Sequence, residues 1–516
     1  TTEIYTLSLH DALPICASLT VESASVTSSG SLIVHGTSTG NVIFNRYLRP
    51  ENNLGDRHFF SSPVEGQSIS LFIAENTTGL PASTKVAGLW EWDELSGQWP
   101  EISASTGDFM PGRGYNVDQS AGSNGLLTFS GTLTASLSVT ATAPYNSEIE
   151  RYNNERGIWG GGGWNLLGNP YTSSMRITDE DADGDDGNSE NDFLAKNLNS
   201  FDPSYQAVYV YNGTVGEHGT YYYIAKPVPF EDPFTSDGPA FSAFEFKNIQ
   251  SGQGFFVLAN YNGVPFSFTR EMQLHNTGIP MTKSAKVENS WPGMHLKVKC
   301  GGSESYTTII YNDRMSVGLD PGYDVGMFNS GGNIEIYSKL VTNDNNVSFA
   351  RQALPVTGAE KIVIPVGIDS KTGGEVTFSA FTVPAGNNKF WLEDRTEGTF
   401  TDLTLKSYVV NIPAKTYGEG RFFILTSVNN PGDIIPPEMD DKGLHVWALD
   451  EKIIIDGDVA NNSFCEIFNL RGTKITETKL EDNDHNIVIL PSGSHGIFLV
   501  RITNGVEVTS NKVVVF

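Results

Sequence analysis

Short runs in which apolar and polar residues alternate dominate this chain, and Gly, Ser and Asn separate them. Residues 18–22, 31–35 and 41–48 follow this pattern, and similar runs recur to the end. Successive side chains of a strand point to opposite faces, so the alternation predicts strands with one buried face. A helical period is limited to a turn or two at 192–198. The sequence therefore predicts an all-β protein with several β-sandwich-like domains in tandem.

Length and charge narrow the possibilities further. A chain of 516 residues is too long for one hydrophobic core, so roughly three to five domains are expected. The formal charge of −27 repels phosphate backbones and anionic membrane surfaces, which argues against nucleic acid as a partner. Divalent cations are natural counter-partners of such a surface. The sequence contains no apolar run of 18 residues and thus predicts no transmembrane segment.

Three ordered matches indicate an internal duplication. Residues 59–64 match 166–171, residues 89–93 match 208–212, and residues 110–117 match 250–257. We therefore expect two β repeats, at 46–143 and 144–285. The second repeat carries about 33 extra residues, which we place in surface loops around 176–197 and 226–244, where insertions cost little free energy.

The remaining segments frame these repeats. Residues 1–16 have no basic segment typical of a signal peptide, and they resemble translated sequencing-adapter read-through. We therefore exclude them from the fold prediction. We expect the chain to be the C-terminal part of a longer protein. Residues 17–45 are predicted to end an upstream β region. Residues 286–427 are predicted to form a β-sandwich domain, and the Pro-rich, acidic stretch 428–443 a linker to the tail at 444–516.

The tail has a specific order of motifs. A strand entering a turn at 465–472 is followed by 487–493, by a Gly-aromatic strand at 496–502 and by a Lys-Val-rich end at 512–516. This order resembles the type A sorting domain of type IX secretion. The resemblance implies a small Ig-like sandwich, export to the cell surface or medium, and the secretion machinery as a partner. The matching residues of the sorting signal are Gly496, Phe498, Val500, Lys512 and Val514.

The layout before the tail also resembles a common architecture of surface proteins exported by type IX secretion. Residues 168–171, 252–255 and 320–324 carry this likeness. Such proteins mostly have no assigned activity, so the likeness implies location more than chemistry.

One acidic stretch fits the spacing D-x-D-x-D-G-x5-E of a calcium loop. Its candidate ligands are Asp179, Asp181, Asp183, Asp185 and Glu190. Carboxylates at alternate positions point into one loop, and calcium takes hard oxygen ligands in number. Asp186 stands where an EF-hand has an apolar residue, and no helix precedes the loop. The sequence therefore favours a free-standing calcium loop over an EF-hand, with a solvated acidic insertion as the alternative.

Aromatic pairs occupy matching places in the two repeats. Trp90 and Trp92 alternate in the first repeat, and Tyr209 and Tyr211 do so in the second. Each pair therefore faces one side of its strand. Rings on one sheet face can stack on sugars, and packing in a β core is the alternative.

Other motifs do not support catalysis. Residues 36–40 match G-x-S-x-G, but a β run follows where a nucleophile elbow needs a helix. The run Gly160–Gly163 lacks the Lys-Ser/Thr and helix of a phosphate loop. Cys16, Cys300 and Cys465 cannot form a disulfide framework and have no zinc spacing. Asp320 and Asp324 flank a Pro-Gly turn and are interpreted as turn carboxylates, with a second cation site as the alternative.

These observations favour a non-enzymatic β-protein, secreted or held at the cell surface, for adhesion or glycan contact. Surface polysaccharide or extracellular glycans are its expected partners. A first alternative is the accessory C-terminal half of an extracellular hydrolase whose catalytic domain lies upstream. The reading frame upstream of this chain would separate these two. A second alternative is a structural spacer without any ligand.

Overall fold

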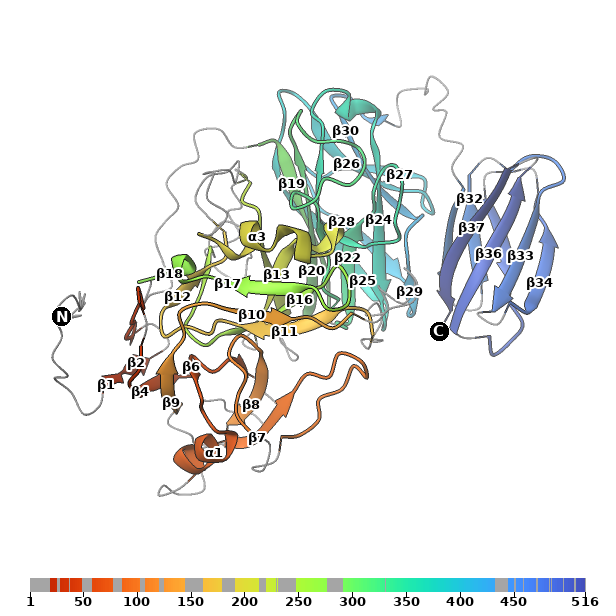
Figure 1. Cartoon of the computed structure of the whole chain (residues 1–516). Coiled ribbons are helices and arrows are strands. Elements are labelled where there is room, and N and C mark those ends of the chain that lie inside the picture. The colour runs from red at the N-terminus through yellow and green to blue at the C-terminus, as the bar shows by residue number, and fades with distance from the viewer. Residues whose placement is uncertain are drawn as a thin grey trace.

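The protein is all-β, as the sequence predicts: about 52% of the chain is strand and 7% helix in the computed structural model (Figure 1). No helix in the described part of the chain is long and apolar enough to cross a membrane. The structure describes residues 19–25, 28–36, 38–48, 58–77, 86–102, 107–119, 125–143, 161–178, 191–212, 220–228, 230, 247–275, 291–329, 331–431, 444–449, 452–457, 459–469, 472–481, 483, 485–494, 496–504 and 507–515.

The first repeat combines two small sheets around one core. Strand β9 pairs with β4 and β6, and β8 lies between β5 and β7. Phe44, Phe60, Phe72 and Phe129 are buried at the centre of this core. Its elements are β4 (Val42–Tyr47), β5 (His58–Phe60), β6 (Val64–Glu65), α1 (Ile69–Thr77), β7 (Val86–Glu91), β8 (Tyr115–Gln119) and β9 (Leu126–Leu133), preceded by β1 (Leu19–Val21), β2 (Ser23–Ser25) and β3 (Ser28–Ser29).

The second repeat has the same plan with additions. Strand β16 lies between β11 and β13, β14 extends the sheet, and β10 pairs with β17. Its elements are β10 (Leu137–Thr140), β11 (Trp164–Gly168), β12 (Ser174–Arg176), α3 (Phe193–Lys196), η2 (Leu198–Ser200), η3 (Pro203–Tyr205), β13 (Ala207–Asn212), β14 (Thr220–Ala225), β15 (Asn248–Ile249), β16 (Gly254–Leu258), β17 (Pro265–Phe268), η5 (Arg270–Met272) and β18 (Gln273–Leu274).

Strand register supports the duplication residue by residue. In the first repeat Phe60 pairs with Tyr115, and in the second the matching Leu167 pairs with Phe255. The next strand pair of each repeat matches as well. Trp90 of β7 pairs with Asn116 of β8, and the matching Tyr209 of β13 pairs with Phe256 of β16. A slip of one residue would turn every side chain to the opposite face. Conserving both registers therefore gives both repeats the same inner and outer faces.

Three features differ from the sequence prediction. Residues 17–45, predicted to end an upstream β region, instead contribute β1 and most of β4 to the sheet and core of the first repeat. Strand β10 lies within the range expected for the first repeat, but its pairing with β17 places it with the second, as β4 pairs with β9 in the first. Helix α1 was not predicted, because Leu71 is apolar yet exposed, which weakens the contrast between the two faces of the helix. Its core-facing side chains are Ile69, Phe72, Ile73 and the buried amide of Asn76. That amide donates to the carbonyl of Phe72 and to that of Thr128 on β9.

The helical turn expected at 192–198 is present as α3 and η2. The carboxylate of Asp192 caps α3 by accepting from the N–H of Ala195 at 2.7 Å. Phe193 is fully buried and packs on Phe255 and Phe268, whose ring centroids lie 5.3 and 5.0 Å away. The end of the inserted segment is thus fixed to the core of the second repeat.

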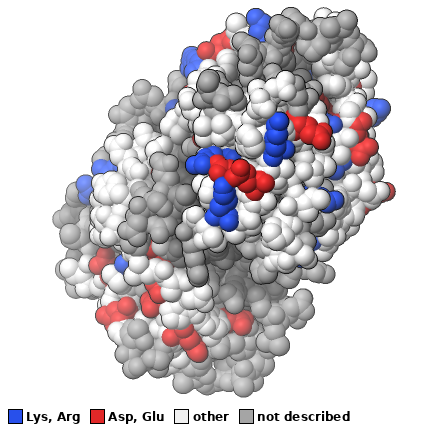
Figure 2. Space-filling view, turned by 90° about the vertical axis from the view of Figure 1, so that its right-hand side faces the viewer, with Lys and Arg blue, Asp and Glu red and all other residues white. Residues whose placement is uncertain are grey.

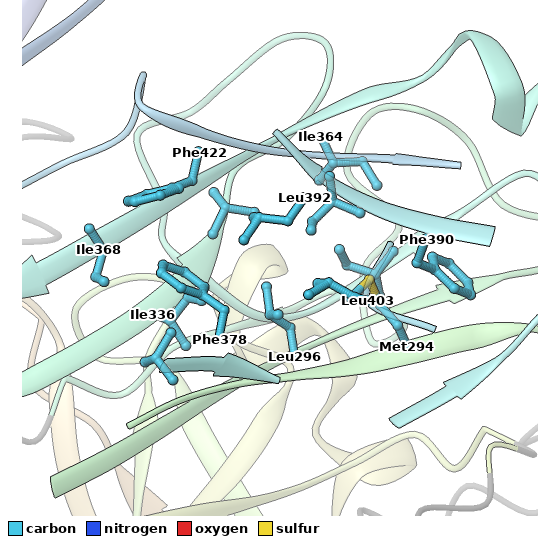
Figure 3. Packing of buried hydrophobic residues seen from close by; sticks show 14 of the residues in the cluster. Met294, Leu296, Ile336, Ile364, Ile368, Phe378, Phe390, Leu392, Leu403 and Phe422 are labelled. Atoms are coloured by element: carbon cyan, nitrogen blue, oxygen red, sulfur yellow. The ribbon is translucent and has the colours of Figure 1, made fainter. Parts of the chain in front are cut away.

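The third domain has an apolar core to which most of its strands contribute (Figure 3). Met294, Leu296, Phe378, Phe422 and Ile364 converge from four strands and are fully buried. Its elements are β19 (Gly293–Cys300), β20 (Ser303–Tyr311), β21 (Val325–Gly326), β22 (Ile334–Ser338), β23 (Phe349–Leu354), η6 (Ala359–Lys361), β24 (Val363–Ser370), β25 (Gly374–Val383), β26 (Lys389–Asp394), β27 (Thr399–Asp402), β28 (Tyr408–Ile412), β29 (Thr416–Tyr417) and β30 (Phe422–Ser427).

The tail forms a C-terminal module with its own core of two sheets, β31-β32-β35 and β34-β33-β36-β37. Figure 1 shows it set off at one end of the molecule, beside β29. The predicted linker lies mostly outside the described residues. The module's strands are β31 (His445–Leu449), β32 (Lys452–Asp456), β33 (Phe464–Asn469), β34 (Lys474–Lys479), β35 (His485–Ile489), β36 (Gly496–Asn504) and β37 (Glu507–Val515).

The module contacts the third domain along one strand edge. Thr416 and Tyr417 of β29 pair with Leu449 and Ala448 of β31. Trp447, only 4% exposed, covers Gly420, where a Cβ atom would overlap the indole ring. Glycine is required there for this close approach.

On the side of the molecule shown in Figure 2, basic and acidic groups adjoin in several patches of the upper part, and the charged groups of the lower part are mostly acidic. On the C-terminal module, Glu466 pairs with both Lys474 and Arg501. Such exposed pairs add little stability.

Candidate functional site at the junction of the two repeats

The two repeats are joined by reciprocal hydrogen bonds. The N–H of Ser61 donates to the carbonyl of Gly252 at 2.9 Å, and the N–H of Gly168 donates to the carbonyl of Gly112 at 3.0 Å. Ser61 and Gly168 occupy matching positions, as do Gly112 and Gly252. Each repeat therefore offers the same strand end and the same turn to the other, in an approximate two-fold arrangement.

Isolated bridges at the same place follow the same rule. Phe60 pairs with Gln253, and Arg113 pairs with Leu167. A side chain at Gly168 would collide with Ser61, because a Cβ atom there would lie 2.5 Å from the Cβ of Ser61. The glycine therefore permits the close approach of the two backbones.

Aromatic rings from both repeats meet beside this junction. Six of these rings belong to one packed core, and the Tyr211 ring contacts two of them, Phe59 and Tyr221. We call the seven the junction cluster: Phe59, Trp92, Trp99, Tyr211, Tyr221, Phe256 and Phe328. The Phe59 ring lies 5.3 Å from both Trp99 and Tyr211, and Trp92 lies 5.1 Å from Trp99. Phe256 and Phe328 are buried, whereas the other five rings are half-buried. The cluster thus combines a packed base with rings that reach solvent.

The structure separates the four aromatic residues predicted for sugar contact. Tyr209 is 1% exposed and donates its hydroxyl to the carbonyl of Gly326 at 2.7 Å, so the prediction is wrong for this residue. The third domain covers it, which the sequence of the repeat alone could not indicate. Trp92 and Tyr211 belong to the junction cluster and are half-buried. Trp90 is also half-buried, and its ring lies over Gly88.

A small pocket lies next to the cluster, between the repeats. Its volume is about 110 Å³. It is lined by the Trp92–Leu95 segment and Arg113 of the first repeat, and by Val139, Thr140, Thr142 and 165–167 of the second. The Trp92 indole N–H donates to the carbonyl of Trp164 at 2.6 Å, which fixes one wall.

Glu94 is the most constrained polar side chain in this pocket. One carboxylate oxygen, Oε1, accepts from the N–H of Gly163 at 2.6 Å, and its backbone carbonyl accepts from Gly161 at 2.7 Å. The other oxygen, Oε2, is buried and has no hydrogen-bond partner among the residues that the structure describes. Gly161 and Gly163, which belong to the run Gly160–Gly163, thus hold Glu94 in place through their backbone N–H groups.

Burial raises the pKa of Glu94 to about 7; the hydrogen bond from Gly163 opposes this rise and the charge of Asp93 adds to it. Sequence reasoning missed Glu94. Its burial depends on the other repeat, so no local pattern could mark it. The sequence offered only its position directly after the matched motif at 89–93.

Asp320 and Asp324, the predicted turn carboxylates, accept hydrogen bonds from backbone groups of their own turn. The N–H of Ser316 donates to Asp320, and the N–H of Asp320 donates to Asp324, both at 2.6 Å. Asp324 also accepts from Ala353 at 2.7 Å. Burial raises the pKa of Asp324 to about 7 despite these donors.

Some predicted positions lie outside the described residues. The candidate calcium ligands Asp179, Asp181, Asp183, Asp185 and Glu190 all do, so the calcium loop stays a prediction. Among the residues that are described, no three His, Cys, Asp or Glu side chains gather as a metal centre. Cys300 and Cys465 are buried free thiols.

The residues of the predicted sorting signal lie on the last two strands. Phe498 and Val500 of β36 are buried in the module's core. Along the backbone, Gly496 pairs with Val515, and β37 places Lys512 opposite Leu499 and Val514 opposite Ile497. The strand pair thus brings the five positions together on adjacent strands.

Comparisons with known proteins identify a family to which the chain is similar. A family model described as "Domain of unknown function (DUF8693)" matches residues 6–425, a match that starts within the segment resembling adapter read-through. No curated protein matches the chain. Solved structures similar to it include a BSP domain of a biofilm-associated protein, at 11% identity over 93% of this chain and 96% of that one, with a TM-score of 0.15. A polysaccharide lyase is 12% identical over 44% of this chain and 40% of its own, with a TM-score of 0.14. Scores this low carry no functional argument.

Ionisation of Glu94 should make the repeats less stable as the pH rises. Its pKa is raised in the folded state, so its contribution is complete below about pH 4.5 and is lost as the pH rises through about 7. Glu94→Gln cannot ionise and keeps an acceptor for Gly163. In chelator, its free energy of unfolding relative to wild type should therefore improve between pH 5 and pH 8, by up to roughly 3 kcal/mol.

Denaturant unfolding at both pH values, followed by tryptophan fluorescence, measures this difference. Asp324 and Glu335, which have similarly raised pKa values, are common to both proteins and cancel in the comparison. The matched control is Glu101→Gln, at an exposed position of the first repeat. An equal difference at both pH values would contradict the assignment.

Proposed function

Since this chain belongs to the DUF8693 family, whose function is not assigned, we propose from the chain itself that it is a non-enzymatic β-protein exported by type IX secretion and displayed at the cell surface. The observation that carries the proposal is the C-terminal module. Its motif order resembles that of a type A sorting domain, and it has a core of its own. That core lies between β31-β32-β35, which continue the third domain's sheet through β29, and the four-stranded sheet β34-β33-β36-β37. An export signal of this kind must fold apart from its cargo.

The repeats and the third domain are the cargo in this proposal. The third domain covers the outer face of the second repeat, because Val325, Phe328 and Phe349 belong to the same core as Trp164 and Tyr209. The cargo is thereby one packed body. The edge pairing of β29 with β31 is its contact with the module among the described strands.

Removing the module should prevent export. In a host with type IX secretion, a chain that ends at residue 431 should accumulate in the periplasm, because the signal is lost while the cores of the cargo remain intact. Cell fractionation and surface labelling measure the distribution. The control is Trp447→Ala, which weakens the contact with Gly420 but leaves the module in place and should still be exported. Normal surface display of the shortened chain would overturn the proposal.

Glycan contact at the junction cluster is the use that the structure supports best for the displayed body. Its half-buried rings Trp92, Trp99 and Tyr211 form an aromatic surface beside a polar pocket, and sugars pack their apolar faces on such rings. This proposal is independent of the route of export.

Replacing one ring of the rim should weaken sugar binding. Trp99→Ala removes the ring that stacks on Phe59 and should lower affinity for a bound polysaccharide roughly three- to tenfold. Affinity electrophoresis against a panel of bacterial surface polysaccharides measures it, with Tyr261→Ala, an exposed aromatic outside the cluster, as the control. Equal mobility of wild type and Trp99→Ala on every polysaccharide would refute glycan contact here.

A further inference from the structure

Two buried carboxyl groups face each other on neighbouring strands of the third domain. Glu335 of β22 pairs directly with Asp369 of β24, and the two residues are only 6% and 8% exposed. Side chains directly opposite each other in an antiparallel pair share one face, with Cβ atoms about 4.5–5.5 Å apart, and like charges there destabilise the pair. Ionising both groups at once therefore costs free energy.

Hydrogen bonds and burial set the charge of this pair. Glu335 accepts from the N–H of Gly332 at 3.2 Å, and the Tyr337 hydroxyl donates to Asp369 Oδ1 at 3.1 Å. Burial raises the pKa of Glu335 to about 7; the charge of Asp369 adds to the rise, while the Gly332 N–H and Lys371 oppose it. Below this pH, Glu335 keeps its proton.

Two lysines lie on the same side of the sheet and donate to backbone carbonyls. Lys371 donates to Gly331, and Lys339 donates to Asn346 at 3.1 Å with its Nζ atom 5.5 Å from the centre of the Tyr337 ring. Lys371 is exposed, so solvent screens its charge. The lysines thus offset only part of the repulsion between the carboxylates.

Asp369 also bonds the segment that contacts the C-terminal module. The N–H of Gly418 donates to Asp369 Oδ1 at 3.0 Å, and the carbonyl of Gly418 accepts from Ile368 at 3.0 Å. Gly418 directly follows β29, which pairs with β31 of the module (Figure 1). A Cβ atom at Gly418 would lie 3.4 Å from the Cβ of Trp447. One carboxylate oxygen thus connects the buried pair to the contact between domain and module.

We propose that the Glu335–Asp369 pair is a proton-sensitive switch for docking of the C-terminal module on the third domain. With a proton on Glu335, Asp369 stays opposite it and holds Gly418 beside the module. Loss of the proton leaves two negative charges at facing positions. Asp369 relieves the repulsion by turning to water, which releases the Gly418 N–H and weakens the contact of β29 with β31. This switch is independent of the route of export and of glycan contact.

The direction of the switch follows from the raised pKa of Glu335. The contribution of this residue to the folded state is complete below about pH 4.5 and is lost as the pH rises through about 7. Docking and protonation are linked, so each favours the other by the same factor. The module should therefore dock more firmly at pH 6 than at pH 8.

Hydrogen–deuterium exchange of the full chain at pH 6 and pH 8 tests the switch. Protection of peptides covering residues 416–420 and 445–449 is compared with that of Glu335→Gln at each pH, so the pH dependence of intrinsic exchange cancels. Relative to this variant, which cannot ionise, wild-type protection should fall roughly three- to tenfold from pH 6 to pH 8, since one pKa unit of linkage is tenfold in an equilibrium constant. Peptides of β19, in the core of the same domain, should show no such fall.

Two further variants separate the switch from a structural role. Asp369→Asn removes one charge but keeps an oxygen for the Gly418 N–H, so its protection relative to Glu335→Gln should not change with pH. Glu360→Gln, at an exposed position of the same domain, should behave as wild type. A wild-type ratio that is equal at both pH values, an equal fall in β19, or a fall that persists in Asp369→Asn would each overturn the proposal.

Discussion

Two backbone hydrogen bonds, from Ser61 to Gly252 and from Gly168 to Gly112, determine where everything else in the body can lie. They run between matching atoms of the two repeats, so neither repeat can shift without breaking its half of the pair. Because the sheets share one register, this contact also fixes which faces meet. The aromatic outer faces come together at the junction, and the third domain covers what remains of the second repeat's face.

The sequence predicted the parts of this arrangement that local patterns encode. Alternation at 89–93 and 208–212 predicted that Tyr209 and Tyr211 share a face; Tyr209 belongs to the core beside the junction, and the Tyr211 ring contacts Phe59 and Tyr221, which pack against that core. The matched motifs predicted the duplication, which strand register supports. Local patterns could not predict what covers each face. From the sequence alone, Tyr209 is a candidate for sugar contact. In the structure it packs in one core with Phe328 and Phe349 of the third domain, which no local pattern predicts.

The candidate site was harder to predict for the same reason. Glu94 follows a strand as an ordinary acidic residue, and only the glycine segment of the other repeat buries it. Helix α1 was missed because its core-facing positions extend over only two turns and the exposed Leu71 weakens the contrast between its faces. In both cases the deciding partner lies far away in the chain, where composition and spacing give no signal.

The C-terminal module differs from the repeats in how few contacts it makes with the rest of the chain. Its core is complete within 444–516, and it contacts the body through one strand edge and Trp447. We expect a module built this way to fold without the body, whereas the two repeats share the hydrogen bonds and the aromatic contacts of the junction. One chain thus combines an interdependent pair of repeats with a self-contained tail.

Hydrogen–deuterium exchange on the full chain tests the reciprocal junction most directly. The amides of Ser61 and Gly168 donate between repeats rather than within a sheet, so their protection reports the contact itself. If the repeats form one unit, peptides covering these two amides should exchange together and as slowly as those of the buried strands β13 and β16. Fast exchange at both amides, with β13 and β16 still protected, would mean that the repeats are separate domains and would contradict the junction.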